Sequence, residues 1–145
     1  MIALIQRVRE AEVRVAGESL GRIGPGILAL IGMVPEDTAA QGERLLQRIL
    51  GYRLFADEAG RMNRSLTQTG GGLLLVPQFT LAADTSQGLR PGFSTAAAPA
   101  AAQPLFEALL AAARTRHSPV ACGRFGADMQ VSLINDGPVT FWLES

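Results

Sequence analysis

The sequence predicts an α/β fold in one domain, with mostly antiparallel β-sheets layered against two main helices on one side. Apolar runs of strand length occur near both ends of the chain, and two segments have helical periodicity. Between those segments lie four large aliphatic residues in a row, Leu73 to Val76. At 145 residues without a break in composition, we expect a single domain over 1–145 that folds without a metal, cofactor or disulfide.

The central stretch runs from Gly70 to Leu81. Its aliphatic run is long enough for a strand buried on both faces and too short for a buried helix. Pro77 then ends the strand, and Gln78-Phe79-Thr80 places an amide, an aromatic ring and a hydroxyl where the strand leaves the core. Such a position suits a functional site, although local pattern alone favours a stopped strand with a capped turn.

The first third of the chain predicts a meander that feeds one sheet. Residues Ile2 to Val15 alternate loosely, as in a long strand with a bulge or in two short strands. Gly17 turns the chain into a short strand, Ser19 to Ile23. After a second turn at 24–26, Ile27 to Val34 is almost wholly apolar and predicts a central strand.

Two helices are predicted, one before and one after the central strand in the sequence. Thr38 and Gln41 have capping-box spacing, which indicates a helix running to about Arg53. Its apolar face comprises Leu45, Leu46, Ile49, Leu50 and Leu54. The second helix lies within Pro99 to His117, and Pro104 predicts that it begins or kinks there. Its buried stripe comprises Phe106, Leu109, Leu110 and Ala113.

The remaining segments read as loops and terminal strands. Phe55 to Ser65 is a turn-rich connector, and Ala82 to Ser94 is an irregular loop expected to form part of a pocket. Strands follow at Val120 to Cys122, Gln130 to Asn135 and Val139 to Leu143. We expect the last two strands to form a hairpin joined by Asp136-Gly137-Pro138.

Composition restricts the surroundings of the protein. The chain is 48% hydrophobic with a formal net charge of zero, so we expect a homo-oligomer in which another subunit covers apolar surface. No apolar run reaches the length of a membrane span, which is about 18 residues. The N-terminus lacks the layout of a signal peptide and Cys122 is the single cysteine, so we expect a cytoplasmic protein.

Several kinds of chemistry are excluded by what the chain lacks. All thirteen basic residues are arginine, so a phosphate-loop lysine and a Schiff-base lysine are impossible. Balanced charge argues against broad, non-specific binding to nucleic acids, DNA included, although clustered arginines could hold a few phosphates. His117 and Cys122 could form a catalytic pair, but a histidine at a helix end and a cysteine in an apolar strand suit structural roles better.

No serine nucleophile elbow is present, and only one histidine could act as a base. A hydrolase built on this chain must therefore work through backbone amides, a threonine hydroxyl and groups of the substrate. Gly137-Pro138 is the second notable feature, because this peptide bond can be cis and then turn two carbonyls outward. A plain Asp-Gly turn stopped by proline is the alternative reading.

Together, Gln78-Phe79-Thr80-Leu81 and Asn135-Asp136-Gly137-Pro138-Val139-Thr140 resemble the two signature motifs of the D-aminoacyl-tRNA deacylase family. The likeness covers the whole chain, from Ile2–Val8 to Phe141–Leu143. It implies a homodimeric enzyme of the deacylase fold that hydrolyses the ester between a D-amino acid, or mischarged glycine, and the 3′ end of tRNA. Gly137 and Pro138 would match a Gly-cisPro element that enters the partner's active site and rejects L-amino acids.

The resemblance also implies roles for other residues. Gln78, Phe79 and Thr80 would match the catalytic pocket, in which main-chain amides polarise the ester carbonyl. Thr80 is a candidate nucleophile by resemblance, but we predict that it positions the substrate, since no base is available to take its proton. Phe125 and Met129 resemble the lining of an adenine pocket or serve the core, and Arg7 would steady the Gly-Pro tip or meet a phosphate.

One departure from the family pattern concerns Pro77, where the motif usually begins with serine. Proline supplies neither a hydroxyl nor an amide proton, so any contact of that serine with substrate is in doubt. This departure motivates a second hypothesis, a catalytically silent dimer that binds an RNA end or a small ligand.

Overall fold

The main sheet is organised around one long strand. The computed structural model describes residues 1–145, and its main sheet has six strands in a mixed arrangement. These strands are β1 (Ile2–Val15), β2 (Glu18–Ile23), β3 (Gly26–Gly32), β6 (Gly72–Pro77), β7 (Val120–Cys122) and β8 (Gln130–Glu144). Strand β1 pairs antiparallel with β2, β3 and β8. The β3–β6 and β6–β7 pairs are parallel, and this architecture confirms the predicted fold class.

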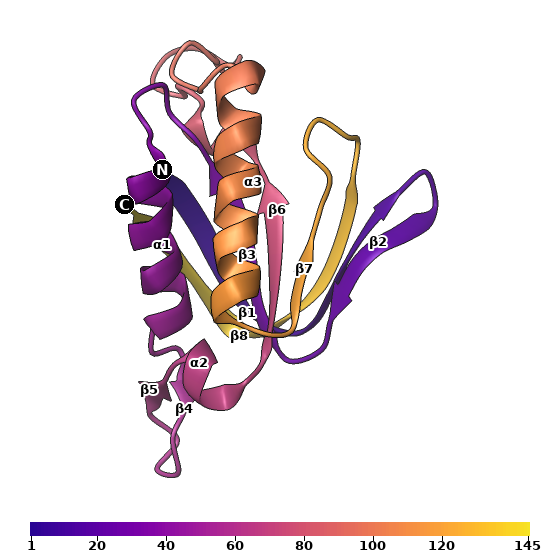
Figure 1. Ribbon diagram of the computed structural model, residues 1–145, viewed down its shortest axis with the longest axis vertical. Helices are drawn as coiled ribbons and strands as arrows, with labels where there is room; N and C mark the ends of the chain where they lie inside the picture. The colour runs from indigo at the N-terminus through magenta and orange to yellow at the C-terminus, as the bar shows by residue number, and fades with distance from the viewer.

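Two helices cover one face of the sheet. Helices α1 (Ala39–Gly51) and α3 (Pro99–Arg116) lie side by side over it (Figure 1). Thr38 caps α1 with the predicted capping box, since Gln41 N donates to Thr38 Oγ1 and Thr38 N donates to Gln41 Oε1. The larger core, with 21 buried residues, includes apolar side chains of both helices and of the sheet. None of the helices combines the length and hydropathy needed to cross a membrane.

Strand β6 is buried on both faces, as its sequence predicts. Leu73 and Leu75 belong to the larger core, whereas Leu74 and Val76 belong to a second apolar cluster of seven buried residues that also contains Val8 and Val13 of β1. Beside this strand, β2 and the loop between β7 and β8 extend away from the helices (Figure 1). The end of β6 is therefore fixed by packing from two directions.

Some boundaries differ from the sequence predictions. Strand β3 ends at Gly32 and α1 ends at Gly51, because Tyr52 adopts an extended conformation. Leu54 is nevertheless buried, beyond the helix. The predicted connector contains a small hairpin, β4 (Phe55–Ala56) and β5 (Met62–Arg64), followed by α2 (Leu66–Thr69).

Helix α3 begins at Pro99 and continues through Pro104 (Figure 1). The second proline removes one helical hydrogen bond, to the carbonyl of Ala100. Ala100 is exposed, so water can satisfy that carbonyl, while Phe106 and Leu109 pack the same helix against the core. Pro104 therefore does not begin the helix, and a kink at this residue stays a prediction.

The predicted C-terminal hairpin is wrong. Strand β8 runs alongside β1 over its whole length, with Thr140 opposite Gln6 and Asn135 opposite Val8. Between these two pairs, only Arg7 of β1 faces the four residues Asp136–Val139, which we call the Gly-Pro bulge. The turn residues in this segment therefore make a bulge within one strand instead of joining two strands.

Candidate active site

An apolar pocket of about 740 Å³ opens where β6 ends. Its walls come from 76–79, from the loop before α3, from the first residues of α3, and from the segment after β7. Eleven of its 16 lining residues are hydrophobic, and none of the 16 has a titratable side chain. We call this cavity the active-site pocket. It can hold an apolar or aromatic group by shape, and it offers no side-chain acid or base.

Four of the predicted site residues meet in this pocket: Gln78, Phe79, Phe125 and Met129. Phe79 is 55% exposed and its ring lies 5.0 Å from the ring of Phe93, centroid to centroid. Exposed aromatic rings around a cavity provide surfaces on which a nucleobase can stack. The predicted loop contributes as expected, since Phe93 lies within it.

Thr80 lies next to the pocket, without lining it. It belongs to a short 3₁₀ helix, η1 (Phe79–Ala82), and its hydroxyl accepts a hydrogen bond of 2.5 Å from Gln78 Nε2. Phe79 and Thr80 open this turn, so their backbone N–H groups have no acceptor inside it. These N–H groups are therefore suited to polarise a carbonyl at the mouth of the pocket.

No histidine or cysteine reaches this position. His117 Nε2 lies 2.7 Å from the carbonyl oxygen of Gly71, at the opposite end of β6. The sulfur of Cys122 lies 3.7 Å from a guanidinium nitrogen of Arg114. The hypothetical Cys-His pair is not formed, and Thr80 has no side-chain base beside it.

Pro77 is the last residue of β6 and also lines the pocket. The neighbouring wall depends on Gly123, because a Cβ atom there would lie only 2.7 Å from Met129 Sδ. Met129 Sδ in turn accepts a hydrogen bond from the backbone N–H of Arg124. Gly123 thus provides the space in which Met129 reaches the pocket.

The Gly-Pro bulge is exposed at Gly137 and Pro138, and the peptide bond between them is cis. Arg7 supports the bulge from below: its Nε donates to the carbonyl oxygen of Asp136 at 2.8 Å, and its NH1 group donates to the carbonyl oxygen of Leu54 at 2.6 Å. These contacts hold the guanidinium of Arg7, whose side chain is 17% exposed, in place.

Asn135 closes the bulge from the other side. Its Oδ1 accepts from Val139 N at 2.8 Å, and its Nδ2 donates to Val139 O at 3.1 Å and to Gln6 Oε1 at 3.1 Å. One side-chain amide thus replaces the strand partner that Val139 lacks. The sequence reading assigned no role to Asn135, although an asparagine before Asp-Gly-Pro is a common turn-stabilising residue.

The bulge and the active-site pocket lie far apart within one chain. Arg7, which faces the bulge, lies opposite Ile27 of β3, and Ile27 lies opposite Leu73 of β6. Pro77, at the pocket, is four residues further along β6, and three strand spacings separate β8 from β6. The separation is about 13 Å along the strands and about 14 Å across them, from the standard spacings of a sheet. A single chain does not bring Gly137, Pro138 or Arg7 to its own pocket.

The loop at the rim of the pocket is held by local hydrogen bonds. Asp84 and Gly92 exchange two backbone hydrogen bonds of 2.8 and 2.9 Å. Hydrogen bonds from the side chain and the backbone N–H of Ser86 lower the pKa of the Asp84 carboxyl. Thr95 Oγ1 donates to the carbonyl oxygen of Ala82. These bonds place Phe93 against Phe79.

Comparison with known proteins identifies the family. A model of the family described as D-Tyr-tRNA(Tyr) deacylase matches residues 4–144. The chain belongs to this deacylase family, and the resemblance noted in the sequence is confirmed.

Two similar relatives are both named D-aminoacyl-tRNA deacylase. The one from Thioalkalivibrio sulfidiphilus is 68% identical, over 99% of this chain and 97% of the relative. The one from Azotobacter vinelandii is 66% identical over 100% of both chains.

Two solved structures are similar to this chain in fold. The structure titled c-Myc DNA Unwinding Element Binding Protein has a TM-score of 0.95 at 39% identity, covering 100% of this chain and 99% of its own. A probable eukaryotic D-amino acid tRNA deacylase has a TM-score of 0.86 at 16% identity, covering 99% and 98%, and shares the fold.

Proposed function

We propose that this protein is a D-aminoacyl-tRNA deacylase, a carboxylic ester hydrolase that releases a free D-amino acid and tRNA. The observation that carries the proposal is the meeting of Gln78 and Phe79 with Phe125 and Met129 around one apolar pocket. This arrangement occurs in a chain that is 68% identical to a relative of that name. Aminoacylated tRNA is the expected partner, and the cytoplasm, where it is used, is the expected compartment.

In the proposed reaction, the terminal adenosine lies against Phe125 and Met129, and the ester carbonyl meets the backbone N–H groups that open η1. Water adds to the carbonyl carbon, the bond to the ribose oxygen breaks, and the proton from water passes to that leaving oxygen. The adenosine 2′-hydroxyl assists this proton transfer, because the pocket holds no titratable side chain. Thr80, held by Gln78, positions the reacting groups.

The stereochemical filter requires a second copy of the chain. In the proposed homodimer, the Gly-Pro bulge of one subunit enters the active-site pocket of the other, and its outward carbonyls accept from the substrate ammonium. An L side chain would collide with the bulge, whereas a D side chain or glycine is accommodated. Exposure of Gly137 and Pro138, their distance from their own pocket, and the half-exposed Ile134 and Trp142 on β8 support this proposal.

Three substrates test the activity: D-aminoacyl-tRNA, the matching L-aminoacyl-tRNA and glycyl-tRNA. We expect release of amino acid from the first and third only, measured as loss of acid-precipitable label. Binding of all three without release would instead favour a silent RNA-end binder, the alternative that Pro77 motivates. Release of the L-amino acid at an equal rate would overturn the proposed filter.

Mixed dimers test the shared site. Gly137→Ala disrupts the bulge, and Ala127→Trp fills the pocket that Ala127 lines; each homodimer should be inactive. In a refolded equimolar mixture, half of the dimers contain one intact site, so about a quarter of the wild-type activity should return if the dimer is symmetric. A mixture as inactive as its parents would show that each subunit works alone.

A further inference from the structure

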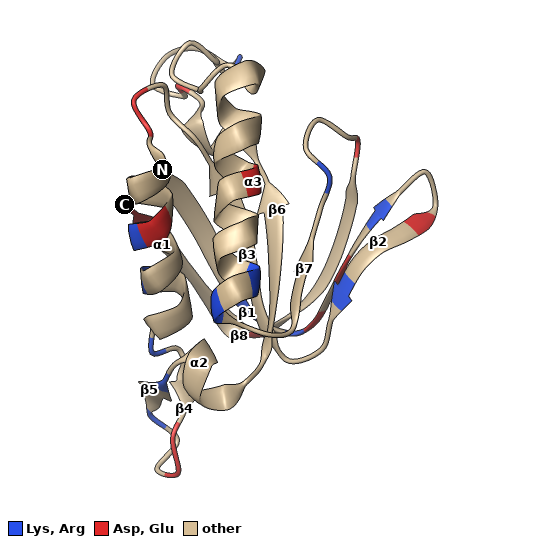
Figure 2. Cartoon of the chain, in the orientation of Figure 1, with Lys and Arg blue, Asp and Glu red and all other residues tan.

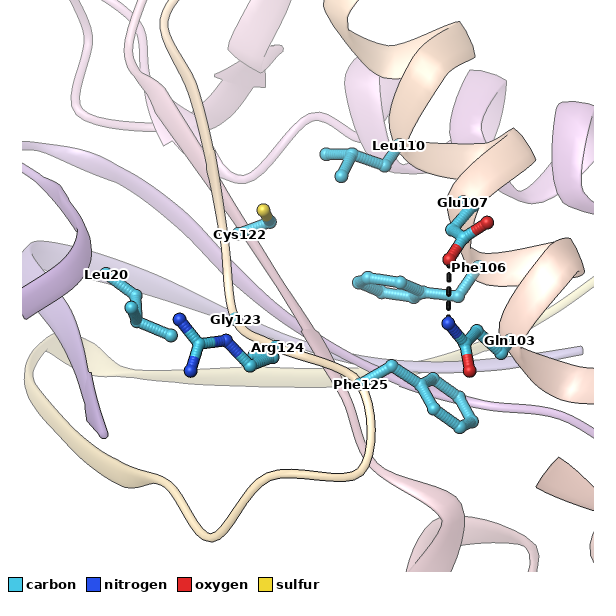
Figure 3. A pocket seen from close by; sticks show the side chains of 9 residues that line it. All are labelled: Leu20, Gln103, Phe106, Glu107, Leu110, Cys122, Gly123, Arg124 and Phe125. Carbon is cyan, nitrogen blue, oxygen red and sulfur yellow. Dashed lines mark hydrogen bonds between the residues drawn. The ribbon is translucent and has the colours of Figure 1, made fainter. Parts of the chain in front are cut away.

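A second cavity, of about 360 Å³, adjoins the active-site pocket and is not used by the proposed reaction (Figure 3). One wall is α3, through Gln103 and Glu107, and the opposite wall is the end of β7 with the segment after it, through Cys122 and Arg124. Phe125 lines both cavities. We call this second cavity the side pocket, and the shared residue makes it the neighbouring cavity for a chain that leaves the active-site pocket past Phe125.

The side pocket has an apolar floor. Phe106 is 3% exposed and lies below the opening, with its ring centroid 6.5 Å from that of Phe125. Leu110 continues the floor along α3. A flat ring can therefore cover this floor while its edge faces the polar groups on the rim.

The polar groups lie on opposite sides. Gln103 Nε2 donates to Glu107 Oε1 at 2.9 Å. The side-chain oxygen of Gln103, Oε1, and the second carboxylate oxygen of Glu107, Oε2, are then left as acceptors. Arg124 lies across the pocket from this pair (Figure 3), and its guanidinium forms neither an ion pair nor a hydrogen bond within the chain. The side pocket thus has two acceptors on one wall and an unpaired cation on the other.

We propose that the side pocket binds the penultimate nucleotide of the tRNA 3′ end, with Arg124 on its phosphate and the Gln103–Glu107 pair on the exocyclic amino group of its base. This inference rests on the proposed function, which places the terminal adenosine beside Phe125. The acceptor end of tRNA is single-stranded, and single-stranded bases are recognised by stacking and by contacts to their edges.

The charges fix the orientation of this nucleotide. Glu107 repels a phosphate, so the phosphate lies toward Arg124, where a guanidinium can bind it through two hydrogen bonds. The guanidinium of Arg114 lies 3.7 Å from the sulfur of Cys122, which lines the side pocket. The base then faces the acceptors. Cytosine, the penultimate base of tRNA, presents an amino donor at this edge, whereas uracil presents an acceptor that would face the carboxylate.

The charge distribution on α3 agrees with a polynucleotide that runs from the active-site pocket toward the side pocket. The first eight residues of α3, from Pro99 to Phe106, carry no charge, and Glu107, Arg114 and Arg116 follow (Figure 2). The uncharged start of the helix lines the active-site pocket through Pro99 and Ala102. The charges begin where the polynucleotide would leave that pocket.

Two substrates separate this proposal from the proposed function: D-aminoacyl-tRNA and the minimal ester D-aminoacyl-adenosine, which has no second nucleotide. For Arg124→Ala, we expect the ratio of kcat/KM for tRNA to kcat/KM for the adenosine ester to fall about tenfold, as for loss of one charge-assisted hydrogen bond. The slope of log KM against log salt should fall by about one unit. Arg61→Ala, another exposed arginine whose side chain has no partner, is the matched control at the far β4–β5 hairpin (Figure 1).

A tRNA whose penultimate cytidine is replaced by uridine tests the base contact. Wild-type protein should deacylate this tRNA about tenfold more slowly, and Glu107→Ala should remove most of that difference, since the variant lacks the carboxylate that distinguishes an amino donor from an acceptor. An unchanged substrate ratio for Arg124→Ala, or an equal penalty for uridine in both proteins, would overturn the proposal. Failure of wild-type protein to cleave either ester would instead overturn the proposed function.

Discussion

The active-site pocket and the Gly-Pro bulge are built on opposite principles. The pocket is concave and apolar, has no titratable lining residue, and is assembled from several segments far apart in sequence. The bulge is a protruding four-residue segment whose shape is fixed by polar contacts from Arg7 and Asn135. The pocket can recognise a base and an ester by shape, and the bulge can offer carbonyls to a cation. In the proposed dimer, the pocket of one subunit and the bulge of the other would complete one site.

The largest effect is expected from Gly137→Ala, which changes the bulge and leaves the lining of the pocket unaltered. A Cβ atom at this position would lie 2.1 Å from Val139 N and 2.8 Å from Val139 Cγ2. The bulge must therefore move, and kcat/KM for D-aminoacyl-tRNA should fall about 100-fold, as for a misplaced positioning group. Gly51→Ala is the control, because a Cβ atom there meets nothing within 4 Å. Full activity of Gly137→Ala would show that the bulge takes no part in the reaction.

Arg7→Ala should have the next largest effect. It removes the hydrogen bonds to the carbonyl oxygens of Asp136 and Leu54, so we expect about a tenfold loss of kcat/KM and poorer rejection of L-aminoacyl-tRNA. Arg9 also pairs with Asp136, but its side chain is 74% exposed. Arg9→Ala should therefore change kcat/KM and the rejection of L-aminoacyl-tRNA less than Arg7→Ala does. Equal losses in the two variants would show that charge matters here more than position.

Thr80→Ala distinguishes a positioning hydroxyl from a nucleophile at the pocket. Gln78 Nε2 holds this hydroxyl and no base lies beside it, so the loss of kcat should stay below about tenfold, with KM nearly unchanged. Thr80→Ser should restore the wild-type rate. Abolished turnover by Thr80→Ala, with binding and folding intact, would assign the attack to this hydroxyl.

His117→Asn should leave the rate and its pH profile unchanged. The pocket holds no titratable side chain, so the inflection in kcat should come from the substrate's ammonium, with a pKa of about 7.7–8.0 for an ordinary α-amino group. The variant weakens only the contact with the carbonyl of Gly71 and should lower the free energy of unfolding by about 1 kcal/mol, measured by urea titration. A shifted pH profile would show that the imidazole of His117 takes part in the reaction.

Much of the fold could be predicted because local signals and tertiary packing agree. The aliphatic run of β6, the capping box of α1 and the apolar stripe of α3 each specify an element without reference to distant residues. The small hairpin and α2 were missed because their segments are short and mostly polar. The C-terminal hairpin was predicted wrongly, because Asp-Gly-Pro signals a change of direction and cannot reveal that both flanking segments pair with β1.

The site was predictable where its residues are adjacent in sequence. Gln78 and Phe79 follow a strand end, and Gly137 and Pro138 form an unusual dipeptide. The loop that contains Phe93 was expected at the pocket, but the contact of the Phe93 ring with Phe79 could not be predicted, because it depends on the loop folding back through Asp84 and Gly92. The separation of bulge and pocket depends on strand register, which no local pattern encodes.

The amide of Asn135 gives the molecule a chemical weak point. Its oxygen accepts from Val139 N while its nitrogen donates to Val139 O, so both of its atoms are needed in one orientation. Slow deamidation to aspartate would preserve the acceptor and replace the donor with an anionic oxygen facing a carbonyl oxygen. Under the proposed function, a stored sample should therefore lose the discrimination between mirror-image substrates before it loses its fold.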